Sequence, residues 1–180
     1  VELAVILRGI CAQQIRQQTI GMISAFTKAI IVKDSYLASH IENVKVYARE
    51  IALCMEVSDS LIEHLETAAA LHDLGKIVIP TEILHKSAPL TNEEMKIVQR
   101  HPLASAEILS PIGMFSQEII IIRHHHENFD GTGYPNGLAG KNIPVGSRIL
   151  AVANVFDAMT STKPWNPNPK AGYWALEQKY

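Results

Sequence analysis

The sequence predicts an all-α fold for this chain of 180 residues. Three observations support the prediction. Apolar residues recur at helical spacing in most segments, residues typical of helix starts and ends separate those segments, and no segment alternates apolar and polar residues as a strand does. With 47% hydrophobic and 19% charged residues, the composition is that of a globular domain with one full core.

The bulk composition excludes several classes of function. A net charge of −2 gives no basis for binding a nucleic acid polymer. The two cysteines, Cys11 and Cys54, are too few for a disulfide scaffold and fit a reducing compartment. The sequence shows neither an apolar run long enough to span a bilayer nor a signal peptide, so we expect a cytoplasmic segment with no membrane span. Because the chain starts at Val1 rather than Met, we expect it to be trimmed or to be part of a longer protein.

The first segment is predicted to pack as a helix or to link an upstream domain. Apolar residues recur through residues 2–32, which should form one or two helices, and residues 33–35 interrupt the pattern. We therefore expect an N-terminal helical segment at residues 1–34 and a main domain at residues 35–180, with its C-terminal end incomplete.

The next two helices are predicted from their periodicity and their ends. Residues 36–55 show a helical apolar stripe. Ser58 or Asp59 can cap the following helix, whose Ala- and Leu-rich run continues to Leu74. Gly75 would then end that helix, as glycine commonly does.

The middle of the chain carries clear start and stop signals. Thr91 and Glu94 have the spacing of a capping box, which starts a helix. That helix should end at His101, because the following Pro102 disfavours the α conformation. A short helix is expected at residues 103–109.

The last third is predicted to alternate helices with one glycine-rich loop. An apolar helix should run from about residue 115 to 126, and a helix is expected at residues 147–161. Between them, residues 127–137 hold three glycines and a proline and read as a loop, which is either a plain surface turn or a phosphate-binding loop. Residues 171–180 are a further helical candidate.

The adjacent pair His72 and Asp73 is the feature around which the chain is organised. On a helix the two side chains point about 100° apart, so they could hold one metal between them or reach two. Lys76 follows one turn after His72 on the same face, where it could neutralise a phosphate oxygen or orient water. The alternatives are a buried, hydrogen-bonded His–Asp pair without metal and a surface lysine.

Further imidazoles come from other segments and turn the pair into a candidate cluster. His40 and His101 lie on separate helices, and three histidines follow one another at residues 124–126. Adjacent helical residues diverge, so all three cannot converge, and His124 is the weakest candidate. Imidazole and carboxylate without thiolate suit iron, manganese or zinc. Two such metals, about 3.5–4 Å apart, would hydrolyse a phosphate ester, with Asp73 bridging them.

Eight short motifs occur in order along the chain. They are Leu71–Ile77, Ile79–Pro80, His101–Pro102, His125–Glu127, Asp130–Pro135, Ile143–Pro144, Arg148–Ala153 and Phe156–Ser161. In this order they resemble the HD-GYP family, a bacterial branch of the HD superfamily of metal-dependent phosphohydrolases. The resemblance covers roughly residues 35–165. It implies an HD-type helical bundle around a dinuclear metal centre, and hydrolysis of cyclic di-GMP to the linear dinucleotide or on to GMP. Because base-reading residues are not evident, 3′,3′-cyclic GMP-AMP is an alternative substrate.

The resemblance also assigns metal ligands by position. They are His40, His72 and Asp73 for the first metal and His101, His125 and His126 for the second, with Asp73 bridging both. Iron or manganese is expected first, with zinc, nickel or magnesium as alternatives. Asn154 stands where the family has a ligating Asp, so the first metal should bind more weakly. Catalytic roles fall to Asp73 and Lys76.

The resemblance assigns substrate and partner contacts as well. The signature loop supplies Gly131, Gly133, Tyr134 and Pro135, which would shape the site and contact a partner such as a diguanylate-cyclase-type domain. Arg148 and Lys163 are the predicted phosphate-binding cations, the second replacing an expected Arg, and Asn166 stands where a basic residue is common. A homodimer is a further option.

Two hypotheses of different class follow. The complete histidine set favours a two-metal phosphodiesterase. Asn154 and Asn166 favour a weakened centre that senses the nucleotide or docks a partner.

Overall fold

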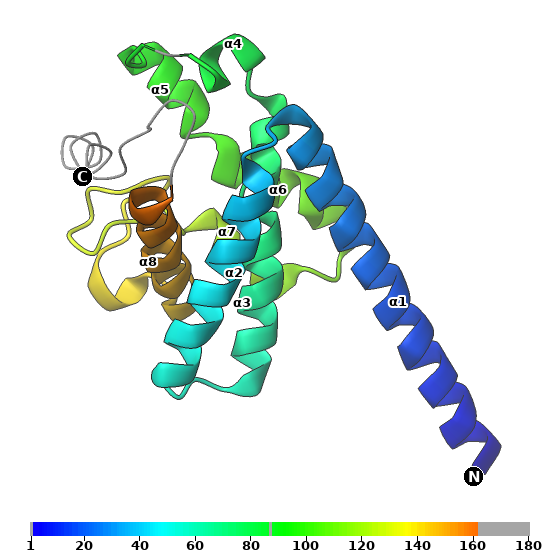
Figure 1. Cartoon of the computed structure of the whole chain (residues 1–180). Helices are drawn as coiled ribbons and strands as arrows, with labels where there is room; N and C mark the ends of the chain where they lie inside the picture. Colours follow the sequence, from blue (N-terminus) through cyan, green and yellow to red (C-terminus); the bar gives the residue numbers. More distant parts are fainter. Residues whose placement is uncertain (1, 87, 162–180) are drawn as a thin grey trace.

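The computed structural model describes residues 2–86 and 88–161, and in this part of the chain it contains helices and loops but no strand. The all-α prediction is therefore confirmed (Figure 1). In chain order the elements are α1 (Glu2–Lys33), α2 (Leu37–Cys54), α3 (Asp59–Leu71), η1 (Leu74–Val78), α4 (Thr81–Leu84), α5 (Asn92–Val98), α6 (His101–Leu109), η2 (Ser110–Ile112), α7 (Ser116–Arg123), η3 (Gly140–Asn142) and α8 (Val145–Thr160), where η marks a 3-10 helix.

A bundle of α2, α3, α6, α7 and α8 forms the core. Helix α2 packs against α3 and α8, α3 packs against α7, and α6 packs against α7 and η1. The buried apolar side chains that join these helices are mostly small or branched, and they include Val44, Ala48, Leu65, Ile122 and Leu150. This packing brings the start of α2, the end of α3, the start of α6 and the end of α7 to one region.

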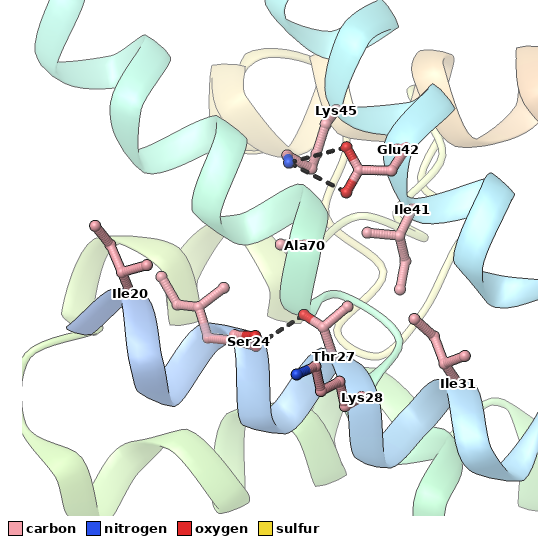
Figure 2. Close-up of a pocket in the computed structure, with 10 residues that line it drawn as sticks. Ile20, Ser24, Thr27, Lys28, Ile31, Ile41, Glu42, Lys45 and Ala70 are labelled. Atoms are coloured by element: carbon pink, nitrogen blue, oxygen red, sulfur yellow. Dashed lines mark hydrogen bonds and ion pairs between the residues drawn. The ribbon is translucent and has the colours of Figure 1, made fainter. Parts of the chain in front are cut away.

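Helix α1 is one continuous helix, where the sequence left open one or two. Its C-terminal part packs against η1, α2 and α3, and its N-terminal part projects away from the bundle (Figure 1). Between α1 and the α2–α3 pair lies a groove of about 400 Å³, with Ala70 on its floor and Lys28, Glu42 and Lys45 among its polar side chains (Figure 2). Among the described residues, no helix combines the length and the apolar character needed to cross a bilayer. The domain division after residue 34 stays a prediction.

The predicted end of α3 is wrong by three residues. The helix stops at Leu71, so His72 caps it and Asp73 adopts φ −95° and ψ 4° in the turn that follows. Gly75 does not end the helix, because it lies within η1. A Cβ on Gly75 would come under 3.0 Å from the His101 carbonyl and the Ser105 amide, so glycine is needed there for close approach of α6.

Two other helix boundaries also differ from the prediction. His101 begins α6 instead of ending α5, because Pro102 is accommodated in the first turn of a helix, where its missing N–H is not needed. Helix α7 ends at Arg123, three residues earlier than expected, so the last histidines lie in a turn. The capping box at Thr91 is confirmed, and Ser58 is the cap of α3.

Candidate metal centre

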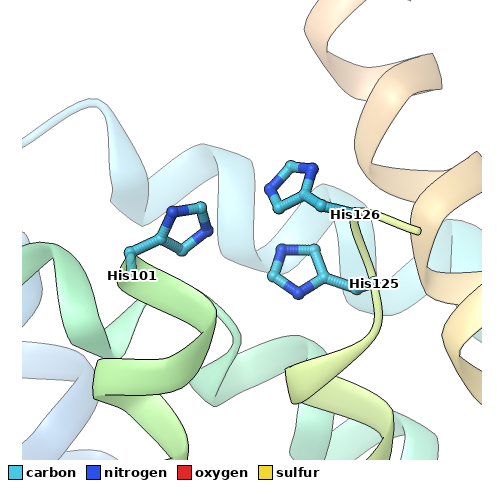
Figure 3. Close-up of side chains that lie close together, drawn as sticks. All are labelled: His101, His125 and His126. Atoms are coloured by element: carbon cyan, nitrogen blue, oxygen red, sulfur yellow. The ribbon is translucent and has the colours of Figure 1, made fainter. Parts of the chain in front are cut away.

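Six predicted ligand side chains lie in two groups at one end of the bundle. Their positions are His40 on α2, His72 and Asp73 after α3, His101 at the start of α6, and His125 and His126 after α7. The first group is His40, His72 and Asp73, and the second group is His101, His125 and His126. Within each group, one ligand atom from each residue lies within 4.8 Å of the others. Figure 3 shows the three imidazole rings of the second group gathered around a common space.

Three of the imidazoles are oriented in the same way by the backbone. In each, Nδ1 lies within hydrogen-bond distance of the carbonyl three residues earlier. The distances are 2.8 Å for His72 to Ala69, 2.8 Å for His101 to Val98 and 2.6 Å for His125 to Ile122. Because a carbonyl can only accept, Nδ1 carries the hydrogen and Nε2 keeps its lone pair.

The lone pairs of these three rings have no partner within the described part of the chain. The Nε2 atoms of His72, His101 and His125 are buried and make no hydrogen bond there. Buried polar atoms without a partner are uncommon because they are costly, and three at one place indicate a group that they bind. A ligating imidazole with its second nitrogen held by a carbonyl is the usual arrangement around a protein-bound metal. The donor set therefore fits divalent metal ions.

Asp73 belongs to the first group and also faces the second. Its Oδ2 is 3.5 Å from His72 Nε2 and 3.9 Å from His40 Nε2, whereas its Oδ1 is 3.5 Å from His101 Nε2. Lys76 Nζ donates to Oδ2 at 2.7 Å. Burial alone would raise the pKa of Asp73, but the neighbouring His72 imidazole and Lys76 ammonium hold it well below its usual value. Asp73 is thus an anion with one oxygen directed at each group.

Four of the imidazoles, those of His72, His101, His125 and His126, are neutral at pH 7. Burial lowers the pKa of His72 and of His101 to about 4, and it lowers the pKa of His125 and His126 well below the usual value. A neutral imidazole is the form that binds metal. These four imidazoles are thus in their metal-binding form over the physiological range.

His40 is oriented by a buried carboxylate that the sequence analysis did not assign a role. Asp157 Oδ2 lies 2.6 Å from His40 Nδ1 and accepts from the Tyr36 hydroxyl at 3.3 Å. Its Oδ1 accepts from Asn43 Nδ2 at 2.8 Å and from Ser161 Oγ at 2.7 Å. Burial opposes the charge, yet the hydrogen bonds from His40, Ser161 and Asn43 lower the pKa of Asp157 to about 2. The sequence signal for this role is that Asp157 is the one acidic residue of the largely apolar α8.

Asn154 lies one turn before Asp157 on α8. It lines a small cavity of about 140 Å³ together with His40, Lys76 and Tyr36. Its amide oxygen would be a neutral metal ligand, where a carboxylate would add a negative charge. Asn154 therefore lies beside the first group, and its role as a ligand stays a prediction.

The signature loop folds back on the second group. Tyr134 N donates to the His126 carbonyl at 3.0 Å, and the two rings stack with their centroids 4.8 Å apart. Buried Glu127 accepts from the Asn136 amide at 2.7 Å and the Leu138 amide at 2.9 Å, which holds both sides of the loop. A Cβ on Gly133 would come under 3.0 Å from the His126 carbonyl. The loop therefore packs around a predicted ligand.

The remaining predicted residues are placed as follows. His124 turns toward Glu127, at 3.7 Å, and belongs to neither group. Gly131 and Pro135 lie in the same loop as Tyr134, one before it and one after it in the sequence. Arg148 lies six residues before Asn154, about 9 Å along the axis of α8. Three further predictions, Lys163, Asn166 and the helix at residues 171–180, lie outside the described residues.

Comparison with known proteins decides the family. The HD domain family matches residues 24–175 of the chain. The chain belongs to this family, in its HD-GYP branch. The matched range begins inside α1.

The similar proteins carry related names. The cyclic di-GMP phosphodiesterase of Thermotoga maritima is 42% identical over 142 residues, covering 76% of this chain and 38% of that protein. The cyclic di-GMP phosphodiesterase response regulator RpfG of Xanthomonas campestris is 40% identical over 147 residues, covering 79% and 38%. The 3′3′-cGAMP-specific phosphodiesterase 3 of Vibrio cholerae is 37% identical over 144 residues, covering 80% and 31%. The matched part spans about a third of each relative.

Proposed function

We propose that this HD-GYP domain is a metal-dependent phosphodiesterase that hydrolyses a bacterial cyclic dinucleotide, with cyclic di-GMP as the first candidate. The observation that carries the proposal is the set of three buried, unpartnered Nε2 atoms around an anionic Asp73. The names of the relatives support the choice of substrate class. Iron or manganese is the proposed metal, since the donors are imidazole and carboxylate.

Each group of residues has a defined role in this proposal. The first group would hold one divalent metal and the second group another, with Asp73 offering one oxygen to each. Bound metals supply Lewis acidity toward the phosphate and activate water at neutral pH. Lys76, partly buried beside Asp73, would place its positive charge against a phosphate oxygen. The Asp157 carboxylate keeps His40 oriented through Nδ1.

The substrate and its surroundings complete the proposal. A hybrid 3′3′-cyclic GMP-AMP is the second candidate, because one similar protein is named for that activity. Arg148 and the loop residues Gly131, Gly133, Tyr134 and Pro135 are proposed substrate contacts. We also propose a protein partner of the diguanylate-cyclase type at this loop, a homodimer, and a location in the bacterial cytoplasm.

A second candidate function rests on Asn154. A neutral amide beside His40 contributes less to metal binding than a carboxylate would. In this second function the first group holds no metal, and the domain senses the cyclic dinucleotide or docks a partner protein. Turnover of cyclic di-GMP and of 3′3′-cyclic GMP-AMP by the protein loaded with Mn²⁺ or Fe²⁺ distinguishes the two. If the domain is a phosphodiesterase, the product should be the linear dinucleotide or GMP. The double variant His72→Ala with Asp73→Ala should then lose both its metal and its turnover. Nucleotide binding without product would favour the sensor, and full metal content in the double variant would refute the ligand assignment.

A further inference from the structure

Lys33 connects the end of α1 to the turn that carries Asp73. Its ammonium group donates to the Ile77 carbonyl at 2.6 Å and also to the Ile79 carbonyl. Both carbonyls belong to the last part of residues 72–79, which we call the His-Asp turn. Lys33 is partly buried at this contact and is the last residue of α1.

Backbone hydrogen bonds link the two carbonyls to the site. The Ile79 amide donates to the Lys76 carbonyl at 3.1 Å, and the Lys76 amide donates to the Asp73 carbonyl at 2.9 Å. The Lys76 side chain then donates to Asp73 Oδ2. A chain of hydrogen bonds therefore connects the Lys33 end of the turn to the Lys76 ammonium and the Asp73 carboxylate.

The other end of the His-Asp turn is fixed from a different helix. Buried Ser105 on α6 donates to the His72 carbonyl at 3.0 Å and accepts from the Gly75 amide at 2.7 Å. Since α6 also begins with His101, Ser105 fixes the start of the turn relative to the second group. Lys33 fixes its end relative to α1, so the turn is held at both ends.

The junction after α1 reaches the first group by a second route. Asp34 follows Lys33 and accepts from the Tyr36 amide at 3.1 Å, and the Tyr36 hydroxyl donates to Asp157, which holds His40. The end of α1 is therefore connected to both the His-Asp turn and the His40 support. Both routes start from the last residue of α1 and the residue after it.

We propose that Lys33 is a positioning residue of the metal centre, which sets the Asp73 and Lys76 side chains by holding the end of the His-Asp turn against α1. The inference rests on the proposed function for its kinetic consequence, but not for its consequence for metal binding. Without the ammonium group, the Ile77 and Ile79 carbonyls lose a charge-assisted donor. The turn then relaxes, and the first group loses the alignment that its metal requires.

The test compares four variants of the full chain by Co²⁺ titration, followed through the absorption of the bound ion. Lys33→Met removes the donors and should weaken binding at the first group about tenfold, as loss of an outer support typically does. Lys33→Arg keeps donors and should restore most of the affinity. Lys33→Gln keeps a neutral donor and should lie between Arg and Met. Lys28→Met, an exposed lysine of the same helix beside the groove of Figure 2, is the matched control and should bind as wild type.

Thermal unfolding of the metal-free variants separates positioning from plain stability. Co²⁺ affinity of folded Lys33→Met within twofold of wild type would overturn the proposal, even if its melting temperature fell. Should Lys33→Met fail to fold, equal affinities of Lys33→Gln and wild type would overturn it. In the loaded enzyme, kcat should fall about tenfold in Lys33→Met with little change in KM. A wild-type protein that binds Co²⁺ but turns over no cyclic dinucleotide would refute the proposed function and leave the Lys33 comparison intact.

Discussion

Replacement of Asp157 by asparagine should disable the first group and leave the second group intact. Each carboxylate oxygen of Asp157 has two donors, His40 with Tyr36 on Oδ2 and Asn43 with Ser161 on Oδ1. An asparagine has one acceptor oxygen, so one pair of donors must face an amide NH₂. If that NH₂ faces His40, it favours the tautomer with the hydrogen on Nε2. A protonated Nε2 cannot bind a metal.

The size of the effect follows from the contacts. Loss of an outer support usually lowers metal affinity about 10- to 100-fold, which corresponds to about 1.4–2.7 kcal/mol. Two hydrogen bonds to a buried charge are also lost, each contributing about 1.5–3 kcal/mol, so the free energy of unfolding of the metal-free protein should fall by about 3–6 kcal/mol. Asp59→Asn, an exposed acid at the start of α3, changes the same functional group far from the site and should have little effect on either quantity.

Isothermal titration with Mn²⁺ at pH 7.5 measures the result. Wild-type protein should show two binding events per chain, and Asp157→Asn should show one event of unchanged affinity and one weakened about 10-fold or more. Equal affinities at both sites in the variant and the wild type would show that Asp157 does not orient a metal ligand. Equal weakening of both sites would mean that the substitution disrupts the fold as a whole, and the melting temperature of the variant should then be lower.

Three further predictions test the packing around Gly75, the protonation state of the buried histidines, and the effect of asparagine at position 154, where the family has aspartate. Gly75→Ala places a methyl group against the His101 carbonyl and should destabilise the protein by about 1–3 kcal/mol in urea unfolding; an unchanged midpoint would contradict the close contact. Because burial lowers the pKa of His72 and His101 to about 4, the unfolded state binds more protons between about pH 6.5 and 4. Unfolding of the metal-free protein should therefore become easier as pH falls, by on the order of 2 kcal/mol per histidine at pH 5, and a flat profile between pH 7 and 5 would argue against neutral buried rings. Asn154→Asp should strengthen Mn²⁺ binding at the first group about tenfold or more, and unchanged binding would remove residue 154 from the ligand set.

Much of the fold followed from periodicity and capping, whereas the ends of helices did not. The capping box at Thr91 was predictable because its two hydrogen bonds are local. The end of α3 depends on the approach of α6 to Gly75, a contact between residues distant in sequence. The prediction therefore continued the helix through His72 and Asp73, where the chain in fact turns.

The predicted ligands lie together for a reason that helical geometry could not supply. His125 and His126 both join the second group because α7 ends at Arg123 and frees them from the divergence of adjacent helical residues. The ligand types were readable from the sequence. Their outer supports, such as Asp157 and Lys33, were not, since each acts across more than 40 residues of chain.

Crystals grown with Mn²⁺, measured at a wavelength where manganese scatters anomalously, test the dinuclear centre most directly. We expect two anomalous peaks about 3.5–4 Å apart, one on each side of Asp73. One should be surrounded by His40 and His72, and the other by His101, His125 and His126. A single peak at the second group would mean that Asn154 leaves the first group without a metal. The absence of a peak at either group would contradict the assignment of these side chains as metal ligands.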